Sequence, residues 1–322
     1  MSDLMRGLPA RQIKRRALAL SELGFGGASI GNLYRATSDE EAAAAVEQAF
    51  ASGIRYFDTA PHYGLGLSER RLGRALRSKD RDHFVLSTKV GRLLVPNPTP
   101  CGSDLAAGGF DVADDLLRQF DYSREGVLRS IEGSLQRLGV DRIDIVYVHD
   151  PENHMDDAVS RALPALCELR DEGVIGAVGA GMNFVPPLRR IVAESDVDVV
   201  MLAGRWTLLD RSGEPLLDEC AERDVAVVAA APFNSGLLSQ AFPTGGKFDY
   251  ADAPAEMVAQ AQHLAQLCSD SGVELPAAAL QFPLRDQSVV SVVPGMRNRA
   301  QVSDTVSRFS APVPDELWRQ IS

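Results

Sequence analysis

The sequence predicts a (β/α)8 barrel, or TIM barrel, that forms as a single domain over residues 1–322. Short apolar segments rich in β-forming residues alternate with helix-like segments along the chain, and no segment has the composition of a linker between domains. There are eight such apolar segments, and eight parallel strand and helix units close into a barrel that usually spans about 250 residues.

The eight candidate strands are residues 23–31, 54–60, 83–91, 142–150, 176–182, 197–204, 225–233 and 288–295. They are nearly continuous apolar runs, which is typical of parallel strands covered on both faces. A doubly wound sheet is the competing fold. The glycine-rich first segment, however, lacks the G-x-G-x-x-G register and is not followed promptly by a helix, so the barrel is favoured.

Helix signals lie between these strands and are clearest in residues 37–53 and 123–139. Both segments have polar N-cap candidates, acidic residues in the first turn and a closing glycine. The longest segment without a regular pattern runs from Leu93 to Phe120, after the third strand. A loop of that length in a compact domain is usually functional, so we expect it to lie over the catalytic face.

Composition limits the possible functions. The chain is 45% hydrophobic and 24% charged, which is ordinary for a globular protein, and its net charge of -11 argues against binding nucleic acid or an anionic membrane. The four cysteines, Cys101, Cys167, Cys220 and Cys268, lie far apart, so we expect reduced thiols and no metal site. Residues 1–16 lack an apolar signal core and no run is long enough to span a membrane, so a cytoplasmic protein is expected.

Four polar residues lie at or just after the ends of neighbouring candidate strands: Asp58, Tyr63, Lys89 and His149. Active groups of barrels collect at the carboxyl ends of the strands. Each residue also has a structural explanation: Asp58 could cap a turn, Tyr63 could be half-buried and His149 could be a core histidine. Lysine is rarely buried without a partner, however, and the four residues together indicate a catalytic site.

Elementary chemistry suggests a role for each of the four. A tyrosine has a pKa near ~10, and an adjacent ammonium such as that of Lys89 lowers it by favouring the phenolate. Asp58 can supply the counter-charge that Lys89 needs, and His149 can donate to a substrate oxygen. Such a site suits interconversion of a carbonyl and an alcohol, provided that a cofactor carries the hydride.

Three segments carry a resemblance to a known family: "GIRYFDTAPHYGLGLSERRLGRAL", "LSTKVG" and "IDIVYVHD". They resemble the signatures of the aldo-keto reductases, and the likeness extends over nearly the whole chain. The resemblance implies a nicotinamide-dependent oxidoreductase in which Tyr63 gives or takes the proton, Lys89 and Asp58 tune it, and His149 orients the substrate. The segments "GRWTLLD" and "FNSGLL" are most similar to sugar 1-dehydrogenases that act on D-threo-aldoses, L-fucose or L-galactose, with pyridoxal 4-dehydrogenase as a close relative.

The resemblance also implies cofactor contacts. Asn183 occupies the position of the asparagine that usually contacts the nicotinamide amide. The backbone of Ser235, Gly236 and Leu237 falls where the pyrophosphate is usually held. The adenosine-phosphate segment contains Gly295, Met296, Arg297 and, a little further on, Gln301.

Two departures from the family pattern bear on the cofactor. Ala230 stands where a tyrosine often stacks on the nicotinamide, so we expect Phe233 or Trp206 to stack instead. Gly295 replaces the lysine of NADP-selective members and Gln301 replaces an arginine. Only Arg297 and Arg299 then remain for the extra phosphate, so NAD is expected to be preferred over NADP.

The leading hypothesis is oxidation of a sugar, of the L-fucose or D-threo-aldose type, at the anomeric carbon to a lactone, with Trp206, Tyr63 and His149 contacting the sugar. A pyridoxal 4-dehydrogenase or a general aldehyde reductase is the alternative within the family. Two other classes remain open: a non-catalytic nicotinamide-nucleotide-binding subunit and a Schiff-base aldolase that uses Lys89.

Overall fold

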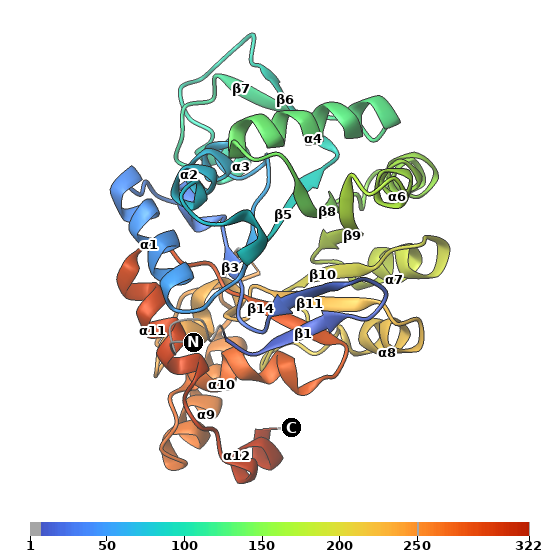
Figure 1. Cartoon of the computed structure of the whole chain (residues 1–322). Coiled ribbons are helices and arrows are strands. Elements are labelled where there is room, and N and C mark those ends of the chain that lie inside the picture. The colour runs from blue at the N-terminus through green and yellow to red at the C-terminus, as the bar shows by residue number, and fades with distance from the viewer. Residues whose placement is uncertain (1–7, 250, 322) are drawn as a thin grey trace.

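The centre of the computed structural model, which describes residues 8–249 and 251–321, is an eight-stranded sheet. Its strands pair in parallel in the order β14-β11-β10-β9-β8-β5-β4-β3. Parallel bridges from Leu23 to Val292 and from Gly26 to Gly295 join the two edges, so the sheet closes on itself with helices outside it (Figure 1). The predicted single-domain (β/α)8 barrel is confirmed.

Each of the eight predicted segments contributes one strand. The barrel strands are β3 (Phe25–Gly26), β4 (Tyr56–Asp58), β5 (Val85–Val90), β8 (Ile143–His149), β9 (Ile175–Met182), β10 (Val199–Ala203), β11 (Ala226–Ala230) and β14 (Val289–Val293). The helices are α1 (Asp39–Ala51), α2 (Leu67–Leu76), α3 (Leu105–Gly108), α4 (Arg124–Leu138), α5 (Met155–Asp157), α6 (Leu163–Asp171), α7 (Val185–Glu194), α8 (Glu214–Glu222), α9 (Ala255–Asp270), α10 (Leu275–Gln281), α11 (Arg299–Phe309) and α12 (Asp315–Ile321).

The two clearest helix signals correspond to α1 and α4. The Ser38 hydroxyl accepts the Glu41 backbone N–H and the Glu41 carboxylate accepts the Ser38 N–H, which is a capping box at the start of α1. At the start of α4 the Ser123 hydroxyl accepts the Gly126 backbone N–H, and Gly139 ends the helix in a left-handed conformation that glycine adopts without strain. Local sequence therefore fixes where these two helices begin.

The first strand is much shorter than its predicted segment of residues 23–31. Only Phe25 and Gly26 are in β3, and a 3-10 turn, η2 (Ser29–Gly31), follows. A side chain at Gly26 would place its Cβ 2.8 Å from the Pro294 carbonyl oxygen, and one at Gly27 would lie 2.6 Å from the Asp58 carbonyl oxygen. The glycines therefore allow the backbone of this segment to lie close to its neighbours at the carboxyl end of the barrel.

An N-terminal hairpin that the sequence analysis did not predict closes the opposite end of the barrel. Strands β1 (Ala10–Ile13) and β2 (Leu18–Ser21) pair antiparallel. Ile13 and Leu20 are fully buried and belong to the same apolar cluster as the side chains inside the barrel, including Tyr56 and Tyr147. The hairpin thus supplies the bottom layer of the interior core.

The predicted irregular segment from Leu93 to Phe120 is also a hairpin. Strands β6 (Arg92–Pro96) and β7 (Leu116–Phe120) pair antiparallel, and α3 lies between them. The prediction of an irregular loop was wrong because cross-strand pairing is a nonlocal property that the composition of the segment does not reveal. Strands β12 (Lys247–Phe248) and β13 (Ala251–Asp252) form a third small hairpin.

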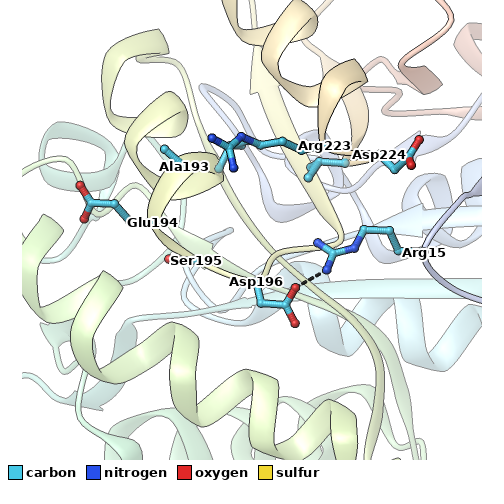
Figure 2. A pocket seen from close by; sticks show the side chains of 9 residues that line it. Arg15, Ala193, Glu194, Ser195, Asp196, Arg223 and Asp224 are labelled. Atoms are coloured by element: carbon cyan, nitrogen blue, oxygen red, sulfur yellow. Dashed lines mark hydrogen bonds and ion pairs between the residues drawn. The ribbon is translucent and has the colours of Figure 1, made fainter.

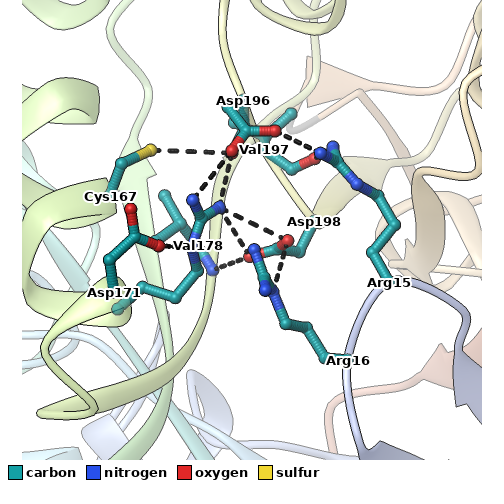
Figure 3. A network of polar contacts seen from close by, with 9 residues as sticks. Arg15, Arg16, Cys167, Asp171, Val178, Asp196, Val197 and Asp198 are labelled. Atoms are coloured by element: carbon teal, nitrogen blue, oxygen red, sulfur yellow. Dashed lines mark hydrogen bonds and ion pairs between the residues drawn. The ribbon is translucent and has the colours of Figure 1, made fainter.

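A buried charge network lies where the hairpin turn meets the amino ends of the barrel strands (Figure 3). Asp198, whose side chain is 0% exposed, lies 2.7 Å from Arg16 and 3.3 Å from Arg170, and it accepts the Val178 N–H. Arg170 also pairs with Asp196, which Arg15 contacts from the turn. These pairs hold the turn and α6 against the start of β10.

A surface cavity of about 470 Å³ lies beside this network (Figure 2). Its lining combines Arg15 and Arg223 with Glu194, Asp196 and Asp224, and the Arg15 to Asp196 pair crosses it. The charges in this cavity therefore largely compensate one another.

Removing the Arg170 guanidinium should destabilise the fold. We expect Arg170→Met to lower the free energy of unfolding by about 3 kcal/mol, because Asp198 would stay buried with one cation fewer. Urea denaturation measures this value. Arg124→Met is the matched control, since Arg124 pairs with Glu168 at the surface and its loss should cost below about 1 kcal/mol. Equal losses in the two variants would contradict a stabilising role for the network.

In the part of the chain that the structure describes, no helix is both long and apolar enough to cross a membrane.

Candidate active site

The four predicted catalytic residues meet at the carboxyl end of the barrel. Asp58 ends β4, Lys89 lies in β5 and His149 ends β8, and these three strands are consecutive neighbours in the sheet. Tyr63 lies in the turn after β4, between Pro61 and Gly64. The strand order therefore explains why residues that are distant in sequence form one cluster.

Lys89 is the centre of this cluster. Its ammonium nitrogen, Nζ, donates to Asp58 Oδ2 at 2.7 Å, to the Thr59 carbonyl at 3.0 Å and to Tyr63 Oη at 3.1 Å. Burial is the largest single effect and lowers the pKa of Lys89, but the combined interactions with Asp58 and Tyr63 outweigh burial, so the pKa is raised. A lysine held as a cation with three acceptors is a poor nucleophile, which argues against a Schiff-base aldolase.

The Asp58 carboxylate is anchored by a buried chain of hydroxyl groups. Ser87 Oγ donates to Asp58 Oδ1 at 2.7 Å. Ser87 Oγ also lies 3.1 Å from Tyr56 Oη, which in turn lies 3.1 Å from Tyr147 Oη. Because the Ser87 proton points to Asp58, the tyrosine hydroxyls can align their protons in the same direction and stabilise the charge of the carboxylate.

The environment of Tyr63 shifts its acidity in two directions. Burial raises the pKa of Tyr63, while the Lys89 ammonium lowers it, and the net shift is upward. The effect of Lys89 is predictable from the sequence, whereas the larger effect of burial on the pKa of Tyr63 depends on the fold. The hydroxyl is thus protonated at neutral pH, and Lys89 limits the cost of forming the phenolate.

Two histidines face Tyr63 across the site. The His149 ring is perpendicular to the Tyr63 ring with centroids 5.8 Å apart, and the His62 ring lies 5.5 Å from that of His149. Burial, with the nearby positive charges of Arg92 and Arg118, lowers the pKa of both histidines well below the usual value. Both are therefore neutral and can form hydrogen bonds without carrying charge.

Asp150 is a further acidic group beside His149. Its Oδ2 lies 3.5 Å from His149 Nε2 and accepts a hydrogen bond from Arg92 at 2.7 Å. Asp150 has a φ of 42°, a left-handed conformation that costs energy in most residues other than glycine. This strain places its carboxylate at the rim of the site, where burial raises its pKa.

These groups line one cavity of about 870 Å³, which is within the size range of small-molecule sites. Of the other residues predicted from the family resemblance, the lining includes Asn183, Ser235, Gly236, Gly295, Arg297 and Gln301, together with Ala230 and Phe233. Among the described residues no group of three or more His, Cys, Asp or Glu could hold a metal ion.

The described lining does not include three other predicted site residues, Trp206, Leu237 and Met296. The Trp206 ring packs 5.3 Å from that of Phe282, and its Nε1 donates to the Pro283 carbonyl. Leu237 is fully buried in an apolar cluster outside the barrel, and Met296 is 1% exposed in the main core. The side chains of Leu237 and Met296 therefore pack in the core.

The cavity also contains residues that the sequence analysis did not identify. His62 precedes Tyr63 directly, and Asp150 follows His149 directly, so their positions in the two signature segments could have indicated them. Phe110 enters from the β6–β7 hairpin, which confirms that this segment reaches the catalytic face. Arg35 and Arg308 line the cavity near Arg297, and no sequence signal distinguishes them from surface arginines.

Comparison with known proteins shows the family. The model of the aldo/keto reductase family matches residues 22–322, and this chain belongs to that family. It is an oxidoreductase that uses a nicotinamide cofactor. It is similar to an aldo-keto reductase structure from Bacillus halodurans in its holo form, with a TM-score of 0.77, 27% identity, and coverage of 98% of this chain and 95% of that one.

Three relatives bear on the substrate. The chain is 47% identical to the D-threo-aldose 1-dehydrogenase of a Pseudomonas species, over 95% of this chain and 94% of that protein. It is 42% identical to the pyridoxal 4-dehydrogenase of Microbacterium luteolum, over 96% of this chain and 95% of that protein. It is 29% identical to the L-galactose dehydrogenase of Arabidopsis thaliana, over 94% of this chain and 88% of that protein.

Two stretches of the cavity lining have a backbone that few residue types allow. Gly26, Gly27 and Gly295 line the cavity, and at each of them a Cβ would lie within 2.8 Å of another protein atom, so this part of the lining needs glycine for its own close packing. Asn234, Ser235 and Gly236 are consecutive residues with positive φ, and Ser235 and Gly236 line the cavity. Such turns form anion-binding concavities, and strain of this kind is concentrated at ligand sites.

Proposed function

We propose that this enzyme oxidises an aldose at its anomeric carbon to the lactone, with NAD as the preferred hydride acceptor. The observation that carries the proposal is the chain of contacts from Asp58 through Lys89 to the Tyr63 hydroxyl, which ends in a cavity shared with neutral His149. The similarity to D-threo-aldose 1-dehydrogenase supports the choice of a sugar.

The protein residues supply proton transfer and orientation. Tyr63 takes the proton of the anomeric hydroxyl, and Lys89 stabilises the phenolate that does so. His149 forms a hydrogen bond to the same oxygen, since its neutral ring can donate without adding charge. A nicotinamide cofactor bound in this cavity would supply the acceptor for the hydride of the anomeric carbon.

The cofactor contacts follow the lining of the cavity. We assign Asn183 to the nicotinamide amide. Ala230 has no ring to stack on the nicotinamide, so we assign the stacking contact to Phe233. Phe233 lines the cavity, whereas Trp206 does not. The left-handed turn at Ser235 and Gly236 holds the pyrophosphate, with a backbone contribution from Leu237. We assign Gly295, Arg297 and Gln301, which line the cavity, to the adenosine, and Met296, whose side chain packs in the core, contributes only through its backbone. Trp206, which packs against Phe282 and is absent from the described lining, is assigned no direct contact with the sugar.

A substrate screen tests the sugar assignment. We expect NAD-linked initial rates with L-fucose or another threo-configured aldose to exceed those with pyridoxal, simple aldehydes and simple alcohols. Recognition of several hydroxyls requires several fixed polar groups, and such a site discriminates sharply between epimers. If pyridoxal or a simple aldehyde is turned over much faster than every aldose, the sugar proposal is wrong while the oxidoreductase class stands.

The cofactor preference is a separate prediction. The Arg297 guanidinium is already bound to the carbonyls of Leu33 and Arg35 and to the Thr37 hydroxyl, and Gln301 accepts the Arg297 backbone N–H. Arg299 is exposed and absent from the described lining. We therefore expect kcat/KM to be higher with NAD than with NADP, because few cations are available to bind the extra phosphate.

Arg35 provides the control for this prediction. It lines the cavity beside Arg297, and the sequence analysis did not consider it, because it lies far away in the chain. The neighbouring Arg308 is paired with Glu274, and Asp304 adds negative charge to the lining. A preference for NADP of tenfold or more, about 1.4 kcal/mol, would contradict the proposal. If Arg35→Ala then lost that preference, the Arg35 guanidinium would be identified as the group that binds the extra phosphate.

The cavity of about 870 Å³ supports a small-molecule sugar or aldehyde as the substrate, and the strongly negative net charge argues against a nucleic-acid partner. We expect the enzyme to act in the cytoplasm, where its four cysteines remain reduced.

A further inference from the structure

His62 is a polar group at the reacting end of the cavity for which the proposed mechanism has no role. It lines the same cavity as Tyr63 and His149, and its Nδ1 is buried with no hydrogen-bond partner among the described residues. A buried polar atom without a partner is costly and uncommon in folded proteins. Such an atom in a catalytic cavity indicates a contact that a ligand completes.

The position of the His62 ring is tightly fixed. It is perpendicular to the Phe110 ring with centroids 5.2 Å apart, and it lies 5.5 Å from the ring of His149. Phe110 comes from the β6–β7 hairpin, so His62 is held between the hairpin and the barrel. Its ring therefore points to a defined place beside the catalytic tyrosine.

The backbone of His62 is fixed by the same hairpin. Arg118 Nη2 donates to the His62 carbonyl at 3.0 Å. Arg118 is itself held by Asp104, which accepts from both of its terminal nitrogens at 2.6 Å. A bidentate pair of this kind is geometrically specific. The hairpin thus positions the turn that carries both His62 and Tyr63.

The charge state of His62 suits recognition of a hydroxyl. Burial and the positive charges of Arg118, Arg92 and Lys89 lower its pKa well below the usual value, so the ring is neutral. One ring nitrogen of a neutral imidazole donates and the other accepts. A sugar hydroxyl can do both, so it fits whichever tautomer is present.

We propose that His62 is a specificity-determining residue whose Nδ1 forms a hydrogen bond with the substrate hydroxyl on the carbon next to the one that is oxidised. The assignment rests on the proposed aldose oxidation. We place the contact at the neighbouring carbon because His62 directly precedes Tyr63 and its ring contacts that of His149, and these two residues are assigned to the oxygen of the oxidised carbon. A substrate that lacks this hydroxyl leaves the nitrogen without a partner.

The test combines a change in the enzyme with a change in the substrate. kcat/KM is measured for the best aldose and for its 2-deoxy analogue in the wild type and in His62→Phe, which keeps an aromatic ring between Phe110 and His149. We expect the wild type to prefer the 2-hydroxy sugar by at least about tenfold and His62→Phe to lose most of that preference. His62→Asn, whose amide lies near the position of Nδ1, should recover part of it.

His154→Phe is the matched control, because His154 lies against the rings of Phe120 and Tyr122 and is absent from the described lining. It should leave the preference unchanged. Thermal unfolding and NAD binding, followed by protein fluorescence, should be similar in all variants and show that they fold.

The outcomes separate this inference from the proposed function. If the wild type oxidises aldoses and His62→Phe keeps the full preference for the 2-hydroxy sugar, the role of His62 is wrong and the proposed function stands. If the wild type oxidises no aldose, the proposed function fails and the hydroxyl assignment fails with it.

Discussion

Tyr63→Phe should lower turnover by roughly 100-fold or more while the enzyme still binds its cofactor. The substitution keeps the ring between Phe110 and His149 but removes the hydroxyl that lies 3.1 Å from Lys89 Nζ. Lys89 retains Asp58 and the Thr59 carbonyl as partners, so the fold should persist. Steady-state rates with NAD and an aldose, together with a cofactor titration, measure the two effects.

Tyr122→Phe provides the comparison for this variant. The Tyr122 hydroxyl is buried without a hydrogen-bond partner in the described chain and is absent from the described lining of the cavity. Its loss should leave turnover near the wild-type value. Near-normal activity in Tyr63→Phe would show that another group moves the proton.

Lys89→Met should reduce turnover by about 100-fold and shift the pH dependence. The ammonium lowers the pKa of Tyr63 by stabilising the phenolate, so its removal raises that pKa further. In the oxidation direction the rate rises with pH as the base forms. The rising limb of the pH–rate profile should therefore move to higher pH in this variant.

Two further variants make the Lys89 experiment decisive. Lys89→Met leaves Asp58 buried without its cation, whereas Asp58→Asn/Lys89→Met removes both charges and should recover stability. The shift of the rising limb of the pH–rate profile to higher pH should persist in the double variant. Lys79→Met, at a partly exposed lysine that contacts the Phe50 ring and is absent from the described cavity lining, should leave the profile unchanged. A profile that does not move in Lys89→Met would remove Lys89 from the mechanism.

The barrel could be predicted from the sequence because its strands are continuous apolar runs separated by helices with local start signals, such as the capping box of Ser38 and Glu41. The hairpins could not, since the pairing of β1 with β2 and of β6 with β7 depends on contacts between segments. Phe25 and Gly26 are all that remains of the first predicted strand, because the glycines after it allow the chain to turn.

The positions of the catalytic residues were predictable for a similar reason. Asp58, Lys89 and His149 lie at the ends of neighbouring strands, and parallel strands bring their carboxyl ends together. Their electrostatics were less predictable. Whether burial or Lys89 dominates the pKa of Tyr63 depends on how completely the surrounding side chains exclude water.

Residues that reach the cavity from distant segments could not be predicted. Arg35 and Phe110 look ordinary in the sequence and become lining residues only through the fold. Trp206 shows the reverse, because an aromatic residue in a family-like segment packs behind the cavity against Phe282.

Transfer of an isotope from the sugar tests the central claim most directly. An aldose labelled with deuterium at C1 is incubated with the enzyme and NAD, and the reduced nicotinamide and the sugar product are analysed by mass spectrometry. We predict that the deuterium appears in the reduced nicotinamide, that the sugar is released as the lactone, and that Tyr63→Phe slows both. Reduced nicotinamide without deuterium, or no lactone from any aldose, would contradict oxidation at the anomeric carbon.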